Sequence, residues 1–194
     1  MDGPLEHSDD NVTALSFLNL TADEAAPRLL GCRLMSNVDG LETEVALTEV
    51  EAYRSDDPAS HSYGGPRGRN VVMFERAGLL YVYRSYGIHW CANVVCGPVG
   101  MGTAVLLRSG RPIAGEGTMT RRRGRSINLT RGPGNLCQAL GITGELNGSD
   151  LLDETSPVRL LPGSPPADFV ATPRIGISKA MDMPWRFVAQ DAPS

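Results

Sequence analysis

Two β-hairpin patterns constrain the fold of this 194-residue chain more than any other feature. In residues 32–53, two stretches with the character of strands flank Asp39-Gly40, a pair that favours a two-residue hairpin turn. Residues 79–95 are rich in β-branched and aromatic residues, and the chain is expected to turn near Tyr86-Gly87. Because hairpins build antiparallel sheets, these stretches argue against a series of parallel βαβ units.

Shorter elements are expected around these hairpins. Thr21 and Glu24 fit the capping box of a short helix that Gly31 can end, with Pro27 as an awkward interior residue. Strands in hairpins with dispersed helices predict the α+β class. The other expected elements are strands over residues 103–108, 156–161 and 173–178, a helix over 132–141 from Pro133 to Gly141, and a brief helix closed by Gly78.

The composition fits one ordinary domain over residues 1–194. No apolar run approaches the ~18 residues of a membrane-spanning helix, and the acidic start MDGPLEHSDD lacks the apolar segment of a secretory signal. We therefore expect a cytoplasmic protein that is not secreted, with residues 1–12 as a flexible tail. The four cysteines match no zinc-ligand spacing and are expected to be buried thiols.

Charge is distributed unevenly along the chain. The net charge is −4, but residues 61–131 hold 11 basic and 2 acidic side chains, whereas residues 1–60 hold 3 basic and 13 acidic ones. A segment with a net charge of +9 suggests a local anion-binding face, because phosphate recognition depends on local charge. Salt bridges between this segment and the acidic first third would explain the same pattern. Charge alone does not distinguish this interpretation from an anion-binding face.

The strand that ends in TEVEAY runs from apolar to acidic residues. Since side chains alternate along a strand, Val45, Leu47, Glu49, Glu51 and Tyr53 share one face. A partly desolvated carboxylate on such a face is a candidate for general acid–base catalysis. The alternatives are a solvent-facing glutamate at a strand end and a coupled pair of carboxylates, as in glycoside hydrolysis.

Three of the five tyrosines lie in the second hairpin. Tyr81 and Tyr83 share a strand face, and Tyr86 is at the turn. Aromatic residues on hairpins commonly pack across strands. A tyrosine at an exposed tip in a basic neighbourhood is unusual for a core residue, and such side chains also serve as wedges between base steps or as platforms for bases.

Two loops concentrate arginine, and either is a solvated connection or an anion contact. GPRGRN holds Arg67 and Arg69, and residues 115–130 are expected to form a basic loop. In RGPGN, Arg131 stands beside the free N–H groups of a helix start, a candidate for a phosphate site. His61 lies in a Ser/Gly loop, and no histidine or cysteine spacing indicates a metal site, so neither metal nor cofactor is expected.

The ordered motifs TEVEAY, HSYGG, RNVVMF, LYVYRSYGIHWCANVV, AVLLRSGRPIAG, GPGNLCQALGI, RIGI and WRF resemble the 3-methyladenine (alkyladenine) DNA glycosylase family, from residue 17 to 187. The resemblance implies a single compact domain with a mostly antiparallel, curved sheet, surrounding helices and a protruding β-hairpin. It also implies base-excision repair on the minor-groove side of double-stranded DNA, nucleoid-associated in a bacterium. The damaged purines are those of the 3-methyladenine, 7-methylguanine, hypoxanthine or ethenoadenine class. We expect a monomer.

The resemblance also assigns roles to residues of these motifs. Glu51 of the E-A-Y motif would activate the water that hydrolyses the N-glycosidic bond, and Tyr86 would intercalate where the damaged nucleotide is flipped out. Asn93 would help to exclude normal guanine, and Arg108 would lie near the water. The expected substrate-binding residues are Tyr53, His61, Tyr83, Asn93 and Arg108; the basic loops add Arg67, Arg69 and Arg131 as contacts to the DNA backbone.

The lysine content limits the mechanism. A bifunctional glycosylase and lyase needs an amine to form a Schiff base, and Lys179, the single lysine, lies outside the matched pocket motifs. A monofunctional enzyme that leaves an intact abasic site is therefore expected. The alternatives are a catalytically weak nucleic-acid-binding module, which has no need of Glu51, and a small-nucleoside hydrolase using Glu49 and Glu51, which has no need of Tyr86.

Overall fold

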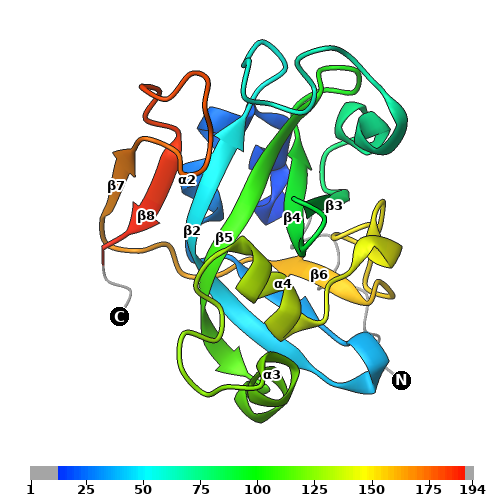
Figure 1. The fold of residues 1–194 in the computed structure, drawn as a ribbon, viewed down its shortest axis with the longest axis vertical. Helices are drawn as coiled ribbons and strands as arrows, with labels where there is room; N and C mark the ends of the chain where they lie inside the picture. Colours follow the sequence, from blue (N-terminus) through cyan, green and yellow to red (C-terminus); the bar gives the residue numbers. More distant parts are fainter. Residues whose placement is uncertain (1–12, 191–194) are drawn as a thin grey trace.

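One antiparallel β-sheet organises the molecule (Figure 1). The computed structural model describes residues 13–190, so the tail expected over residues 1–12 lies outside the described part. Within it, eight strands form a curled sheet with the order β3-β4-β5-β2-β1-β6, while β8 pairs with β2 and β7 with β8. The strands are β1 (Arg33–Ser36), β2 (Thr43–Tyr53), β3 (Leu80–Ser85), β4 (His89–Cys96), β5 (Thr103–Ala114), β6 (Val158–Leu161), β7 (Phe169–Thr172) and β8 (Arg186–Ala189). The α+β class and the curved antiparallel sheet are confirmed.

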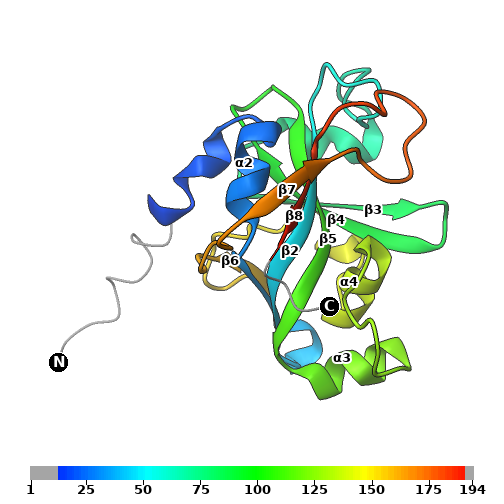
Figure 2. The ribbon, with the colours of Figure 1, turned by 90° about the vertical axis from the view of Figure 1, so that its left-hand side faces the viewer.

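Helices lie on both sides of the long β2–β5 pair. Figure 2 shows α2 (Ala22–Leu29) on one side and α4 (Pro133–Leu140) on the other, with α3 (Glu116–Arg123) against α4. Four 3₁₀ turns complete the described part: η1 (Ser16–Asn19), η2 (Val38–Gly40), η3 (Gly68–Phe74) and η4 (Gly144–Leu146). Among residues 13–190, no helix is both long and apolar enough to cross a membrane.

Helix α2 follows its sequence signals. The Thr21 backbone N–H donates to the Glu24 carboxylate (3.2 Å), one of the two reciprocal bonds of the capping box that begins this helix. The Thr21 hydroxyl donates to the same carboxylate (2.7 Å). Ala22, Ala25, Ala26 and Leu29 are buried at the spacing of one helix face. The burial of this face stabilises the helix although Pro27 lies inside it. The helix ends at Leu29, shortly before Gly31, whose φ is +84°.

The β3–β4 hairpin protrudes from the body of the molecule (Figure 2). Its register runs from Leu80↔Val94 to Ser85↔His89, and a turn at residues 86–88 joins the strands. Tyr86 and Gly87 both have positive φ there, 49° and 70°. Gly87 adopts that conformation without strain, so the turn expected near Tyr86-Gly87 is confirmed.

The β2–β5 ladder has register shifts on both sides of Glu49, besides another between Glu44 and Val45. The pair Glu49↔Ser109 lies between Leu47↔Gly110 and Val50↔Leu107. Arg108 of β5 therefore has no partner residue on β2 in this ladder. Val45 and Leu47 are buried in the apolar core. Irregular pairing re-aims side chains and is common next to active sites, and here it lies where β2 changes from apolar to acidic residues.

Residues 115–130 are not the basic loop that the sequence suggested. Their first half is helix α3, bounded by Gly115 and Gly124 with φ of 74° and 65°. The helix is held by arginine side chains that bond to backbone carbonyls: Arg122 to Val38 (2.9 Å) and Arg123 to Leu129 (3.0 Å). The Arg122 contact joins residues 84 positions apart, so a local pattern of polar residues did not indicate it.

Three further expectations were wrong. The Asp39-Gly40 turn belongs to a wider connection over residues 37–42, whose Val38 carbonyl is engaged by Arg122. The brief helix before Gly78 is the 3₁₀ turn η3, which ends at Phe74. No strand forms over residues 173–178, because the Ile175 N–H donates to the Glu51 carboxylate (2.8 Å) instead of a neighbouring strand.

Candidate active site

Glu51 is fully buried near the end of β2, and hydrogen bonds reach both of its carboxylate oxygens. The Tyr53 hydroxyl donates to Oε2 (2.9 Å), and the Ile175 backbone N–H donates to Oε1 (2.8 Å). The Arg108 guanidinium adds a charged contact, with Nη1 3.2 Å from Oε1. A buried carboxylate needs such partners to replace its lost hydration, and together they fix its orientation.

Tyr53 connects this carboxylate to the surface of a cavity. Burial, and then the negative charge of Glu51, raise the pKa of Tyr53, so its hydroxyl stays protonated and donates. The Arg174 guanidinium lies 4.6 Å from the centroid of the Tyr53 ring. Arg174 is itself buried in an ion pair with Asp57 and donates to the Ala52 carbonyl (2.9 Å), so the ring is held from behind.

An aromatic cluster forms the opposite wall. The Tyr81 and Tyr83 rings stack with centroids 5.6 Å apart, and the His61 ring meets Tyr83 edge-on at 4.4 Å. His61 Nδ1 lies 3.0 Å from the Tyr81 hydroxyl oxygen, and Asn93 donates to the Tyr81 carbonyl (3.0 Å). Desolvation, helped by the charge of Arg69, lowers the pKa of His61, although the residue keeps an exposed edge.

A cavity of about 320 Å³ lies between these walls. This volume is at the small end of the ~300–1,000 Å³ range of ligand sites, which suits a group the size of a nucleobase. Glu51 lies behind the wall formed by Tyr53. The lining residues are Tyr53, Ala59, Ser60, His61, Arg69, Met73, Tyr81, Tyr83, Arg84, Ser85, Tyr86, Asn93, Gly176 and Ile177.

The structure therefore brings most of the predicted residues together. Tyr53, His61, Tyr83, Asn93 and Arg69 line the cavity, as does Tyr86, which is 89% exposed at the hairpin tip. Arg108 is not part of the lining, and its guanidinium contacts the Glu51 carboxylate.

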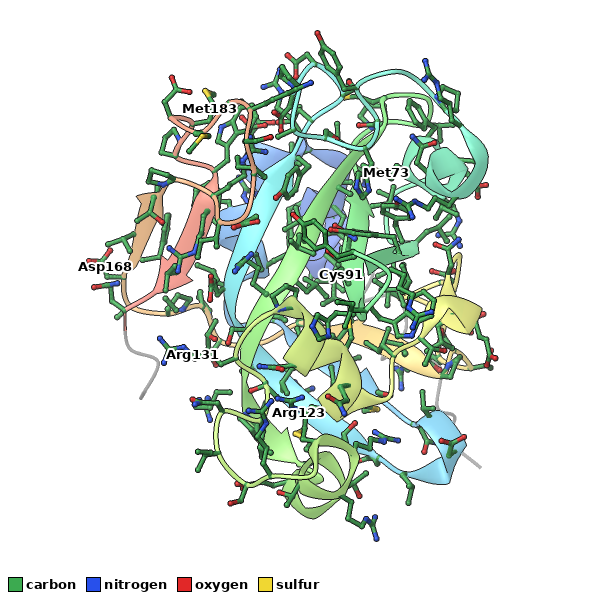
Figure 3. The ribbon with its side chains drawn as sticks, viewed as in Figure 1. Met73, Cys91, Arg123, Arg131, Asp168 and Met183 are labelled. Carbon is green, nitrogen blue, oxygen red and sulfur yellow. The ribbon has the colours of Figure 1, made fainter. Side chains whose placement is uncertain are left out.

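Two predicted backbone contacts lie elsewhere. Arg67 is exposed on the loop before η3 and is not part of the lining. Arg131 is on the α3–α4 connection, clearly apart from the lining residue Met73 in Figure 3.

Sequence reasoning missed three contributors to the site. Tyr81 is buried against His61, and its position two residues from Tyr83 was the available signal. Arg174 and the Ile175 N–H come from the segment expected to be a strand, and no local pattern marks them. Within residues 13–190, no group of three or more histidine, cysteine or acidic side chains is arranged to hold a metal ion.

Comparison of the sequence with known proteins assigns the chain to a family. The sequence profile of Methylpurine-DNA glycosylase (MPG) matches residues 16–193, nearly the whole chain. The chain belongs to the methylpurine-DNA glycosylase family. Membership makes it a DNA glycosylase, a hydrolase of N-glycosidic bonds whose substrate is DNA, and confirms the family, the enzyme class and the DNA partner expected from the motifs.

Curated relatives of this methylpurine-DNA glycosylase family member are similar over most of their length. A protein of Mycolicibacterium fortuitum is 51% identical over 177 residues, covering 87% of this chain and 89% of the relative. One of Rhodopseudomonas palustris is 48% identical over 178 residues, covering 91% and 84%. Both carry the name 3-methyladenine DNA glycosylase.

Proposed function

We propose that this glycosylase excises a damaged purine from double-stranded DNA by flipping the nucleotide into the 320 Å³ cavity, where Glu51 activates a water molecule. The observation that carries the proposal is the placement of Glu51: a buried carboxylate, oriented by three donors, directly behind an aromatic wall of the cavity. The name of the relatives supports 3-methyladenine as one of the lesions. We propose a monomer that acts in the cytoplasm.

The chemistry follows from the two oxygens of Glu51. Oε1 is engaged by Ile175 and Arg108, whereas Oε2 accepts one hydrogen bond from Tyr53 and keeps a second acceptor position. A water bound there loses a proton to Glu51 as its oxygen bonds to C1′. The N-glycosidic bond breaks and its electron pair leaves with the base, so the product is an intact abasic site.

Base selection would come from the cavity walls. Tyr53 and Tyr83 offer faces on which a flipped base can stack, worth about 1–3 kcal/mol per base. An alkylated purine carries positive charge, which interacts favourably with electron-rich tyrosine faces and makes the base a better leaving group. Asn93, whose amide is fixed on the Tyr81 carbonyl, would collide with the exocyclic amino group of normal guanine.

The protruding hairpin would open the duplex. Tyr86 is exposed at its tip beside the cavity, so it can enter the minor groove and fill the space that the flipped nucleotide leaves. Arg69, in the cavity wall, and the exposed Arg67 would contact the flanking phosphates. Arg131 would contact the backbone at a greater distance from the lesion.

The test is a panel of duplexes, each with one 3-methyladenine, 7-methylguanine, hypoxanthine or 1,N6-ethenoadenine, followed by alkaline cleavage of abasic sites. We expect excision of at least one lesion and none of normal guanine. Binding to every duplex without excision would favour the nucleic-acid-binding alternative. Hydrolysis of free nucleosides at rates equal to those on duplex DNA would favour the nucleoside hydrolase.

A borohydride trap tests the monofunctional assignment. Lys179 is exposed two residues beyond the cavity-lining Ile177, so its amine is the side-chain candidate for a Schiff base. We expect no trapped enzyme–DNA adduct while excision proceeds. A trapped adduct that disappears in Lys179→Gln would contradict this assignment.

A further inference from the structure

Glu49 is the second carboxylate of β2, and it is held more tightly than any role assigned so far requires. Its Oε1 accepts hydrogen bonds from Arg108 Nε on β5 (2.8 Å) and from Arg186 Nε on β8 (2.6 Å). Arg186 in turn donates to the Thr172 hydroxyl on β7 (3.0 Å). Burial alone would raise the pKa of Glu49, but these two guanidiniums lower it, so Glu49 is a carboxylate at neutral pH.

Arg108 joins Glu49 to Glu51. Its Nε contacts Glu49, and its Nη1 lies 3.2 Å from Glu51 Oε1, so one planar guanidinium spans both carboxylates. The β2–β5 ladder skips Arg108. Backbone pairing therefore does not fix the direction of this residue, and its side chain is held by the two carboxylates that it contacts.

We propose that Glu49, anchored by Arg186, is a positioning residue that sets the place and the effective charge of Arg108 beside the catalytic Glu51. The proposal rests on the function proposed above for Glu51. With Glu49 ionised, the Arg108 charge is shared between two carboxylates, and Glu51 keeps the basicity it needs to take a proton from water. Without that charge, Arg108 pairs with Glu51 alone and makes it a weaker base.

Strand β2 also provides a matched control. Glu44 is buried at the other end of the strand and pairs with Arg33 of β1, with Nη1 2.8 Å from Oε1. It is thus another inter-strand ion pair on the same strand, but far along β2 from Glu51. If the Glu49 pair only stabilised the sheet, Glu49→Gln would behave like Glu44→Gln.

The experiment measures single-turnover excision of the lesion that the wild type cuts fastest, for the wild type, Glu49→Gln and Glu44→Gln across a range of pH. We expect Glu49→Gln to excise at least about 10-fold more slowly at neutral pH, since small misplacements of catalytic groups cost up to about 100-fold. Its affinity for the duplex should change less than about 2-fold. The acid limb of its rate profile should move to lower pH, while Glu44→Gln keeps the wild-type rate and profile.

Arg186→Gln is a second variant, because Arg186 is more exposed and its loss leaves the Glu49–Arg108 contact in place. We expect a smaller rate loss in the same direction, in a variant that stays folded but melts at a lower temperature because Glu49 loses one of its two guanidinium partners. Wild-type rate and pH profile in folded Glu49→Gln, beside an active wild type, would overturn the positioning role. An inactive wild type would contradict the proposed function itself, so the two failures are distinguishable.

Discussion

At the scale of the residue, the two carboxylates of β2 differ in what surrounds them. Glu49 is bonded by two guanidiniums at 2.8 and 2.6 Å. Glu51 has one guanidinium, at 3.2 Å, with a backbone N–H and a phenol as its other donors. Positive charge therefore surrounds Glu49 more fully than Glu51.

The sequence pattern could place these carboxylates but not rank them. Alternation along the strand puts both on one face, and Arg108, which contacts both, agrees with that. Their difference depends on Arg108 and Arg186, which are 59 and 137 positions from Glu49 in the chain. The resemblance to a family singled out Glu51, and the local pattern did not.

His61 is predicted to titrate below the usual histidine range. Desolvation by the pocket and the Arg69 charge lower its pKa, so the folded protein takes up this proton at lower pH than the unfolded chain does. The resulting loss of stability is absent above about pH 6.5, the unfolded value, and grows as pH falls below it. NMR titration, with His61→Gln to assign the signal, checks the direction. A pKa above 6.5 would contradict it.

At the scale of the element, the β3–β4 hairpin separates two tasks. Its strands contribute Tyr81, Tyr83 and Asn93 to the cavity, while its tip presents Tyr86. Because Tyr81, Tyr83 and Asn93 sit in regular paired strands, the cavity should persist when the tip is changed.

We therefore predict that Tyr86→Ala excises from duplex DNA roughly 10-fold or more slowly, with a smaller effect on a single-stranded substrate. A flipped base in a duplex needs its vacated place filled, whereas a single strand has no stack to hold open. Paired single-turnover assays on the two substrates measure this. Equal loss on both would remove the wedge role.

Helix α3 leads to a prediction about stability. Arg123 is buried and donates to the carbonyl of the buried Leu129 and to the exposed Gln138, so its truncation leaves the Leu129 acceptor unpaired. Arg123→Ala should lower the free energy of unfolding by about 1–3 kcal/mol, whereas Arg125→Ala, at an exposed position, should change it by less than about 0.5 kcal/mol. Urea denaturation compares them. Unchanged stability in Arg123→Ala, with weakened DNA binding, would restore the interpretation of this segment as a DNA-contacting loop.

Local signals predicted some elements and not others. The capping box of α2, the Pro133 and Gly141 ends of α4 and the turn of the second hairpin are set by neighbouring residues, and the structure has them as expected. Helix α3 depends on Arg122, which reaches the carbonyls of Val38 and Ala139, 84 and 17 positions away. The extended segment after β7 is likewise fixed by Glu51 and Asp57, which lie more than 100 positions away.

At the scale of the whole molecule, the site is assembled where five segments converge, one of which is η3 with Arg69 and Met73. The other four are the end of β2, the loop that carries His61, the β3–β4 hairpin and the loop after β7. The loop after β7 also supplies the Ile175 N–H that orients Glu51. Of the 11 arginines in residues 61–131, Arg69 and Arg84 line the cavity and Arg108 contacts Glu51, so part of this positive charge belongs to the site. Another part lies on α3, which carries Arg121, Arg122 and Arg123.

The most direct test of the central claim is single-turnover excision by Glu51→Gln on a duplex carrying the lesion that the wild type removes fastest. Glutamine keeps the shape of Glu51 but cannot accept the proton, and general-base catalysis contributes about 10²–10⁴-fold. We predict a rate loss in that range with duplex affinity within about 3-fold of wild type. Excision by Glu51→Gln at the wild-type rate would contradict the account.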